Sequence, residues 1–204
     1  MDLSCVSASK FETKTNQIMN KLFKVAFAAF VFLSAHMAFA QMEKTVEVGG
    51  APMYPSKNIV ENAVNSADHT TLVAAVKAAG LVETLQGKGP FTVFAPENSA
   101  FAKLPAGTVE TLLKPENKGQ LTAVLTYHVV AGKMGSKDIA DAIKKGNGKA
   151  TLTTVQGGKL TAWMKGKDLY ITDENGGQSK VTIADVWQSN GVIHSVDTVV
   201  LPKM

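Results

Sequence analysis

The hydrophobic pattern of this chain changes period near its middle, and that change limits the folds open to it. From Asn58 to about Tyr127, apolar residues recur at helical spacing, interrupted by one β-rich segment at 91–96 that a proline ends. From Thr151 onward, short segments of strand-forming residues alternate with glycine-containing turns. A helical first part followed by a β meander indicates a single α+β domain.

The elements expected from this pattern are short. The predicted helices span about 58–64, 70–79, 81–85, 97–104, 108–113 and 116–127. The predicted strands span 91–96, 151–155, 160–164, 169–172, 181–186 and 192–201. Asp68 or Thr70 is the expected N-cap of the second helix, Thr108 that of the fifth, and Gly80 ends the second helix.

The first 40 residues carry the pattern of a secretory signal peptide. Lys21 and Lys24 form a positive region, 25–33 is an uninterrupted apolar run, and small residues stand at the cleavage positions before Ala40-Gln41. A membrane-spanning helix needs about 20 apolar residues, so this run is too short to be one. We expect cleavage between Ala40 and Gln41 and export to the periplasm or out of the cell.

The region before the signal is unusual. Asp2 and Glu12 do not suit a signal peptide. Either translation starts at Met19, or the signal peptide has a long n-region that includes these two residues. Cys5 is the only cysteine, and cleavage at Ala40 removes it. The processed chain then has no disulfide, no thiol nucleophile and no lipid-anchoring cysteine, which suits a bacterial envelope protein without a membrane anchor.

The processed chain is expected to comprise a flexible lead-in over 41–57, rich in Gly and Pro, and one domain over 58–204. From Gln41 onward it has 17 lysines, no arginine and 15 acidic residues, a net charge of +2. Nucleic-acid binding calls for clustered basic residues that include arginine. The scattered lysines therefore favour a solvated surface over a nucleic-acid partner.

Three segments carry a family resemblance: TVFAPENSAF at 92–101, YHVV at 127–130 and NGVIHSVD at 190–197. In order and separation they resemble the signature blocks of the fasciclin-type adhesion domain (fasciclin I / beta-Ig-H3), over about Asn58 to Pro202. The matching residues in the first and third blocks are Thr92, Phe94, Ala95, Pro96, Phe101, Asn190, Gly191, His194 and Asp197.

The resemblance implies a wedge-shaped β-sandwich wrapped by several α-helices, in the single-domain form that bacteria export. It implies a non-catalytic module for cell adhesion, attached to a surface, matrix or envelope protein or polysaccharide. It implies no cofactor, and we expect a monomer. Tyr127 and His128 are the residues most often invoked for adhesion in this family. Asp185-Val186 partly matches an Asp-Ile pair that resembles an integrin-recognition motif in animal members.

Each of these candidate partner-binding residues has a structural alternative. Tyr127 and His128 end an apolar helical stripe, as core residues with hydrogen-bonded polar atoms do. Asp185 can be a strand-end residue that hydrogen-bonds a turn. Trp163 alternates with Leu160 and its neighbours, so it should lie on the opposite face, where it is either an interface hot spot or an ordinary surface residue.

Enzymatic chemistry finds little support in the sequence. His194 and Ser195 are strand neighbours that point to opposite faces, and no Gly-x-Ser-x-Gly segment occurs. His69, His128 and His194 lack the spacing of helical metal ligands, so no metal site is predicted. The alternative function is a periplasmic small-ligand carrier or enzyme with an unrecognised pocket, which a deep cleft with a titratable group of perturbed pKa would favour.

Overall fold

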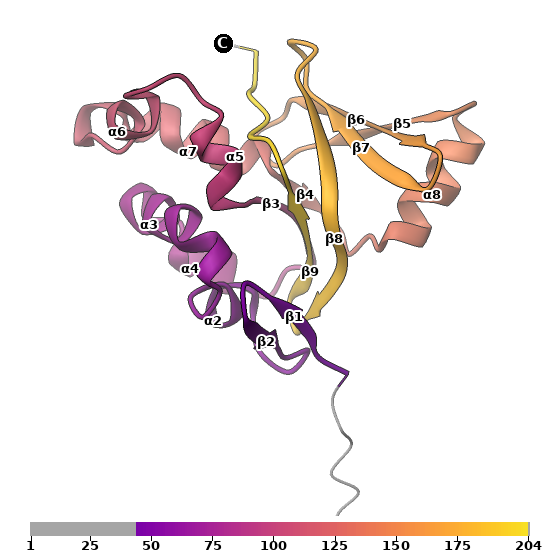
Figure 1. Cartoon of the computed structure of the whole chain (residues 1–204), viewed down its shortest axis with the longest axis horizontal. Coiled ribbons are helices and arrows are strands. Elements are labelled where there is room, and N and C mark those ends of the chain that lie inside the picture. The colour runs from indigo at the N-terminus through magenta and orange to yellow at the C-terminus, as the bar shows by residue number, and fades with distance from the viewer. Residues whose placement is uncertain (1–43, 204) are drawn as a thin grey trace, which may run out of the picture. The chain divides into compact units, whose positions relative to one another are not determined.

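The computed structural model describes residues 44–203, which contain one seven-stranded mixed sheet with helices packed against it (Figure 1). The strand order is β4-β3-β9-β8-β7-β6-β5, and only β3 and β9 pair in parallel. The strands are β3 (Phe91–Pro96), β4 (Val129–Ala131), β5 (Lys149–Thr153), β6 (Lys159–Lys165), β7 (Asp168–Thr172), β8 (Gln178–Gln188) and β9 (Gly191–Val196). The predicted α+β class is confirmed.

The two outermost strands of this sheet come back together. A single bridge joins Val130 near the end of β4 to Thr154 just after β5. Beside it, the backbone N–H of Val155 donates to the carbonyl oxygen of Val129 at 2.7 Å. The sheet therefore curls into a barrel-like layer with an inside and an outside.

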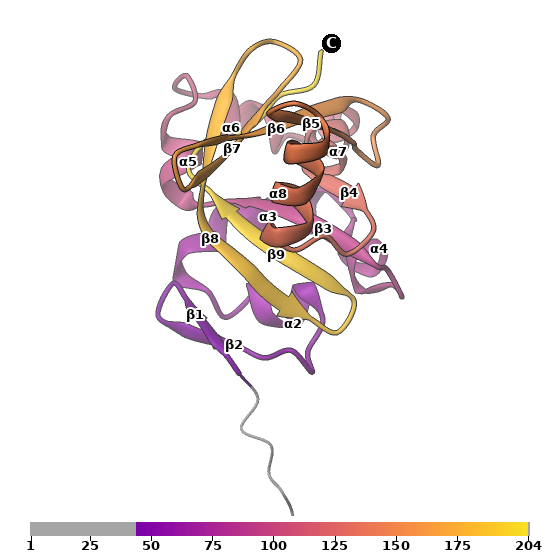
Figure 2. The ribbon, with the colours of Figure 1, turned by 90° about the vertical axis from the view of Figure 1, so that its right-hand side faces the viewer.

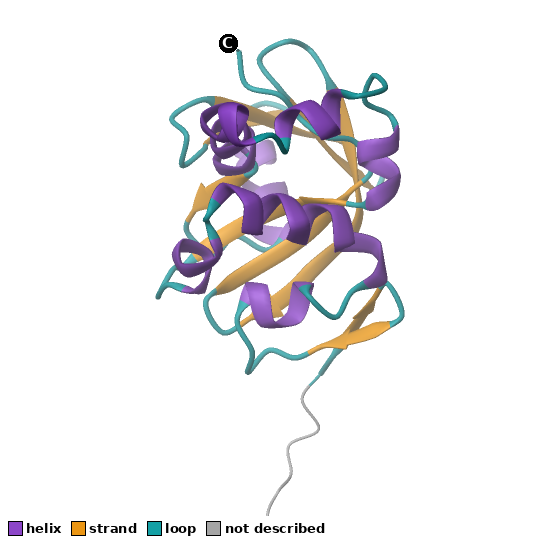
Figure 3. Ribbon diagram, turned by 90° about the vertical axis from the view of Figure 1, so that its left-hand side faces the viewer, coloured by secondary structure: helices purple, strands orange, loops and turns teal. Residues whose placement is uncertain are grey.

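Helices cover the sheet unequally. Within the described residues they are α2 (Ile59–Ala63), α3 (Thr70–Ala79), α4 (Val82–Gln86), α5 (Asn98–Ala102), α6 (Thr108–Leu112), α7 (Lys118–Tyr127) and α8 (Ser136–Lys145), with 3₁₀ turns at Ala67–His69 and Pro115–Asn117. Helices α2 to α7 lie on one side of β3 and β9 (Figures 1 and 3), whereas α8 packs beside β5 and β6 (Figure 2). None of these helices is long and apolar enough to cross a membrane.

Two large hydrophobic cores result, because successive residues of a strand point to opposite faces, and a third, small cluster comprises Ala100, Val124 and Val199. Val93 and Ile193 face helices α2, α3, α4 and α7, whereas Phe94 and Val196 face the inside of the curled sheet. The buried members of the first, the helix-side core, are Val48, Met53, Ile59, Leu72, Ala75, Val76, Ala79, Leu85, Val93, Ala95, Leu121, Leu125, Val129, Val186 and Ile193. Those of the second, the barrel core, are Phe94, Tyr127, Val130, Ile139, Ile143, Ala150, Leu152, Leu160, Ala162, Leu169, Ile171, Val181, Val196 and Val200.

The segment expected to be a flexible lead-in is ordered from Val46. Strands β1 (Val46–Val48) and β2 (Ala51–Met53) form an antiparallel hairpin whose turn, Gly49-Gly50, has positive φ at both glycines. Val48 and Met53 are 2% and 3% exposed and belong to the helix-side core. The flexible lead-in predicted for 41–57 is therefore wrong over these strands, because their apolar side chains find a core to enter.

Other local predictions also changed. Gly80 ends α3 as predicted, in the left-handed conformation. The cap at the start of α3 comes neither from Asp68 nor from Thr70 but from Asn98, whose side-chain oxygen accepts from the backbone N–H of Thr71 at 3.0 Å. Thr108 makes no capping bond either, since Gly107 occupies the N-cap position of α6. Strand β4 and helix α8 were not predicted, and β9 is shorter than the expected 192–201.

Candidate functional site

Tyr127 lies at the end of α7 with its ring inside the barrel core, 0% exposed. Its hydroxyl donates to the carbonyl oxygen of Lys159 at 2.8 Å and accepts from the backbone N–H of Glu174 at 3.2 Å. Burial raises the pKa of Tyr127 to about 12, so the phenol stays neutral. The side chain ties α7 to β6 and to the turn between β7 and β8, and it does not reach the surface.

His128 follows at the C-cap of α7 and is 3% exposed. The backbone N–H of Val200 donates to Nε2 at 3.2 Å, so the ring proton is on Nδ1, which donates to the carbonyl oxygen of Val124 at 2.8 Å. Burial lowers the pKa of His128 to about 4 and keeps the ring neutral. Both ring nitrogens are therefore used within the fold.

The first and third signature segments lie side by side, as the parallel strands β3 and β9. Phe94 pairs with His194 in register, and their rings stack with centroids 5.7 Å apart. Gly191 pairs with Phe91, and a side-chain carbon at Gly191 would collide with the carbonyl oxygen of Phe91. Phe94 and His194 are both fully buried, so these segments lie inside the fold.

The polar side chains of these segments serve backbone groups elsewhere in the chain. The amide of Asn190 accepts from the N–H of Ile59 at 3.0 Å and donates to the carbonyl oxygens of Leu85 and Gly87 at 2.7 and 2.9 Å. It thus fastens α2 and the end of α4 to the turn between β8 and β9. A buried amide with three partners is a structural anchor.

Thr92 plays a similar part on the other side of β3. Its hydroxyl donates to the carbonyl oxygen of Gly132 at 2.7 Å and accepts from the N–H of Met134 at 2.9 Å, which fixes the loop between β4 and α8. The remaining apolar residues of the first segment, Ala95, Pro96 and Phe101, are buried or half-buried. No residue of this segment presents a free polar group from inside the sheet.

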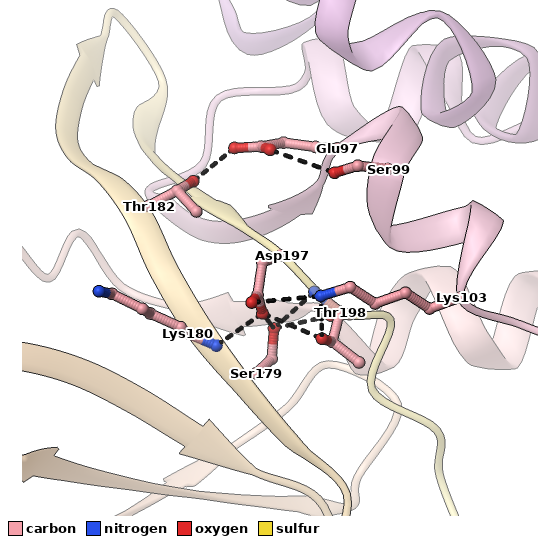
Figure 4. Close-up of polar contacts among 8 residues, drawn as sticks. All are labelled: Glu97, Ser99, Lys103, Ser179, Lys180, Thr182, Asp197 and Thr198. Carbon is pink, nitrogen blue, oxygen red and sulfur yellow. Dashed lines mark hydrogen bonds and ion pairs between the residues drawn. The ribbon is translucent and has the colours of Figure 1, made fainter.

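Asp197, just after β9, is the centre of a half-exposed polar cluster (Figure 4). It accepts from the backbone N–H of Lys180 at 2.9 Å and from the hydroxyl of Thr198 at 3.0 Å, and it pairs with Lys103 Nζ at 3.2 Å. Partial burial acts to raise the pKa of Asp197, but these bonds outweigh it and hold that pKa below its usual value. The cluster joins α5 to β8 and β9, and an ion pair this exposed contributes little to stability.

Asp185 and Val186, the candidate recognition pair, lie in a β-bulge of β8. Asp185 has a φ of 61°, and its carboxylate accepts from both the backbone N–H (2.6 Å) and the hydroxyl of Ser136, the first residue of α8. A carboxylate at a helix N-terminus is stabilising. Val186 is 1% exposed in the helix-side core. The pair therefore holds α8 and the core rather than projecting to solvent.

Trp187 is the large side chain that this bulge turns outward. It is 39% exposed, and the ammonium group of Lys133 lies 5.2 Å from its ring centroid. The same ammonium donates to the carbonyl oxygen of Gln188 at 2.9 Å. The sequence left Trp187 unplaced, since the bulge breaks the alternation that would have given its face.

Trp163 lies on the outside of the curled sheet, on the face that its alternation with Leu160 predicts. Its ring stacks on Tyr170 of β7 with centroids 4.9 Å apart, and its indole N–H donates to Thr172 Oγ1 at 2.9 Å. We call the surface around this pair the outer face. Its residues are Lys149, Thr151, Thr153, Lys159, Thr161, Trp163, Lys165, Asp168, Tyr170, Thr172, Gln178, Lys180 and Thr182.

The residues that suggest hydrolase chemistry are separated by the sheet. His194 Nε2 lies 2.9 Å from the carbonyl oxygen of Met134, whereas Ser195 points to the other face, where its Oγ lies 3.4 Å from His69 Nε2. His69 and Ser195 are 2% and 0% exposed. Burial lowers the pKa of both His69 and His194. The Ser–His contact is inside the fold and has no access for a substrate. Within residues 44–203 no cluster of three or more metal-binding side chains occurs.

The helix-side core contains a cavity of about 80 Å³ between α3, α4, α7 and the sheet. Its walls are almost entirely apolar and include Leu72, Val76 and Leu125. His69 and His128 border it, but their ring nitrogens already have protein partners. An apolar pocket of this kind suits an apolar group.

The family described as the fasciclin domain matches residues 67–202. Protein sll1483 of Synechocystis is 44% identical over 186 residues, which cover 88% of this chain and 96% of that protein. The cell surface glycolipoprotein MPB83 of Mycobacterium bovis is 37% identical over 122 residues, or 60% of this chain and 48% of MPB83.

A solved structure also resembles this fold. It is a FAS1 domain pair from the insect cell adhesion molecule fasciclin I, which superposes with a TM-score of 0.63 at 16% identity. The match covers 78% of this chain and 58% of that chain. At this identity the likeness shows a shared fold, and it agrees with the α+β domain expected from the sequence.

Proposed function

Because the chain belongs to the fasciclin domain family, we propose that it is an exported, non-catalytic module that attaches to a cell-surface, matrix or envelope partner. The family predicted from the three sequence segments is confirmed. A cell adhesion molecule and a cell surface glycolipoprotein are among the proteins it resembles. Those descriptions apply to the other proteins, and they support the proposal because this chain is similar to those proteins.

One observation carries the proposal: the residues that identify the family are engaged inside the fold. Tyr127, His128, Asn190 and His194 are buried, and their polar atoms bond backbone groups. A catalytic site needs reactive groups that a substrate can reach. These features therefore build a rigid scaffold, and we place attachment on exposed side chains outside the three segments.

Export is the part of the proposal that rests on the sequence alone, because Ala40 and Gln41 lie outside the described residues. The test is expression of the full chain in a bacterial host, followed by fractionation and N-terminal sequencing. A product beginning at Gln41 in the periplasm or the medium supports export. A cytoplasmic product that keeps Met1 or Met19 would contradict it.

Attachment can be tested with the purified full-length chain applied to host cells, isolated envelopes and matrix-coated surfaces. We expect saturable binding to at least one of them. A Phe94→Asp variant, which places a charge in the barrel core, is the unfolded control and should lose binding. Absence of binding by the folded chain to every one of these surfaces would refute the attachment function.

The cavity in the helix-side core supports a second candidate, a carrier of a small apolar molecule. Its walls offer no free polar group, so the ligand would be a short alkyl or single-ring compound. The test is NMR of the methyl groups in xenon- or benzene-saturated buffer. Shifts confined to Leu72, Val76 and Leu125 support the carrier, and unchanged spectra would eliminate it.

A further inference from the structure

We propose that the outer face of strands β5 to β8 is the attachment surface and that it takes an anionic polysaccharide. This inference rests on the proposed attachment function and names its partner class. It begins from the register of the strands, which brings residues from four segments into one row across the sheet. Lys149 lies opposite Trp163, Trp163 opposite Tyr170, and Tyr170 opposite Lys180.

The row places two aromatic rings between two cations. Adjacent strands lie about 4.8 Å apart, so the row extends about 14 Å from the first lysine to the last. The stacked pair of Trp163 and Tyr170, with centroids 4.9 Å apart, stands at its middle. Such a row is long enough to meet more than one unit of an extended polymer.

Positive charge is concentrated on this face in a way that the linear sequence hides. Five lysines lie on it or in its β6–β7 turn. Asp168 and Glu174 lie beside them, and Asp197 and Glu97 reach the β8 edge of the face at Lys180 and Thr182. These lysines are Lys149, Lys159, Lys165, Lys167 and Lys180. The lysines of this face outnumber its acidic residues, and its net positive charge complements an anionic partner.

Most of these cations are available to a ligand. Lys180 pairs with Asp168 at 2.8 Å, and the hydrogen bond to that carboxylate raises the pKa of Lys180. The ammonium groups of Lys149, Lys159 and Lys165 make no hydrogen bond or ion pair with any residue in the described part of the chain. A ligand would gain these cations without breaking an existing pair.

The polar residues beside the lysines favour a polysaccharide over other polyanions. A second row, Thr151, Thr161, Thr172 and Gln178, runs parallel to the first across the same strands. Hydroxyl and amide groups both donate and accept, as sugar hydroxyls require. The face carries no protruding apolar side chain of the kind that enters a lipid surface.

The aromatic pair also argues against nucleic acid. Single-stranded nucleic acids bind by stacking bases on open aromatic faces. Here Trp163 and Tyr170 stack on each other, and the Trp163 indole N–H donates to Thr172, so a base could enter between the rings only by breaking these contacts. Its exposed edges can still lie against a sugar ring.

The other side of the same strands explains why this face is rigid. Ala150, Leu160, Ile171 and Val181 fill the barrel core, so the backbone beneath the outer face is fixed by packing. A preorganised surface loses little conformational entropy on binding. The lysine side chains are the parts that must become ordered.

The experiment uses the full-length chain and alginate, a carboxylate polysaccharide, in a titration followed by tryptophan fluorescence. Trp187→Phe provides the background, because it leaves Trp163 as the remaining tryptophan. We expect a saturable change in Trp163 emission that weakens as salt is raised. The triple variant Lys149→Gln/Lys159→Gln/Lys165→Gln should reduce affinity at least about tenfold, the scale expected from three lost charge contacts.

A matched control separates position from net charge. Lys114→Gln/Lys118→Gln/Lys137→Gln removes the same charge from exposed positions away from the outer face and should keep alginate affinity within about twofold. Neutral dextran should not bind. Equal loss in the two triple variants, absence of alginate binding, or tighter binding of single-stranded DNA or of anionic lipid vesicles would each overturn the inference.

The two proposals fail separately. If the chain binds envelopes but the outer-face triple variant binds them equally well, the attachment function stands and the polysaccharide surface is refuted. If alginate binds through the three lysines but no cell, matrix or envelope is bound, the surface stands and the attachment function is refuted.

Discussion

The helix-side core and the barrel core share strands β3 and β9 but differ in how they are closed. The barrel core is enclosed by strands and by α8, and its largest members, Phe94 and Tyr127, are 0% exposed. The helix-side core is enclosed by several short helices, and it contains the cavity. Tight packing makes a core intolerant of changes in side-chain volume. A cavity leaves slack, that is, room for side chains of different volume. The barrel core should therefore carry most of the specificity of the fold.

The most direct way to break this comparison is to truncate one leucine in each core. Leu160→Ala, at a 0% exposed position in the barrel core, should cost about 3–5 kcal/mol of unfolding free energy. Leu85→Ala, at the cavity wall, should cost about 2–3 kcal/mol, because Leu85 already lacks neighbours on one side. Urea unfolding measures both. An equal or larger loss for Leu85→Ala would show that the cavity provides no slack.

Acid should destabilise the domain through its buried histidines. Burial lowers the pKa of His128 from about 6.5 unfolded to about 4, so the unfolded chain binds more protons between those values. The contribution of neutral His128 to the free energy of unfolding is complete above pH 6.5 and is lost as pH falls toward 4. It amounts to about 3 kcal/mol in total, of which about 2 kcal/mol is gone by pH 5. Urea unfolding at pH 7.5 and pH 5 tests it, and equal stability at the two values would contradict it.

The same titration compares the cores through their own histidines. His69 borders the helix-side core and His194 stacks on Phe94 of the barrel core, and burial lowers both pKa values. If the helix-side core opens more easily, His69 should protonate at higher pH than His194. NMR of the ring protons reports each site, and the reverse order would place the weaker core inside the barrel.

Tyr127→Phe separates a structural role from a binding role. Loss of the hydroxyl leaves the carbonyl oxygen of Lys159 and the N–H of Glu174 without that partner, at a cost of about 1–2 kcal/mol. Tyr170→Phe, on the outer face, should cost less than about 0.5 kcal/mol. Attachment measured at a temperature where both variants are folded should be unchanged by Tyr127→Phe. Lost attachment without lost stability would restore Tyr127 as a binding residue.

The smallest expected effect is an increase in stability. Val76→Ile adds one methyl group toward the cavity and should stabilise the domain by about 0.5–1 kcal/mol. Val196→Ile makes the same addition in the barrel core and should destabilise it by about 1 kcal/mol. Thermal unfolding measures the two shifts, and shifts of the same sign would mean that the cores do not differ in slack.

Much of the fold could be predicted, because each local pattern reports a local structure. Gly80 signalled the end of α3, and alternation placed Trp163 on the face opposite Leu160. Helix α8 was missed because its buried side chains, Ile139 and Ile143, make a narrow stripe among charged residues. The sequence does not predict the β1–β2 hairpin, because glycine and proline are as frequent in flexible segments as in tight turns.

The candidate site depended on information that no local pattern holds. The cap supplied by Asn98 to α3 and the anchoring of α8 by Asp185 both join segments far apart in the chain. The lysines of the outer face looked scattered because they come from separate strands, and only the register brings them together. The family resemblance identified the fold, whereas the outer face became visible only from the register of the strands.

The parallel pairing of β3 with β9 has a consequence for the order of folding. These two strands are far apart in the sequence, at Phe91–Pro96 and Gly191–Val196, with every strand of the meander between them. Neither core can close until the last strand is available, and contacts between distant segments form slowly. A nascent chain should therefore stay open until its synthesis is nearly finished, which is compatible with the proposed export.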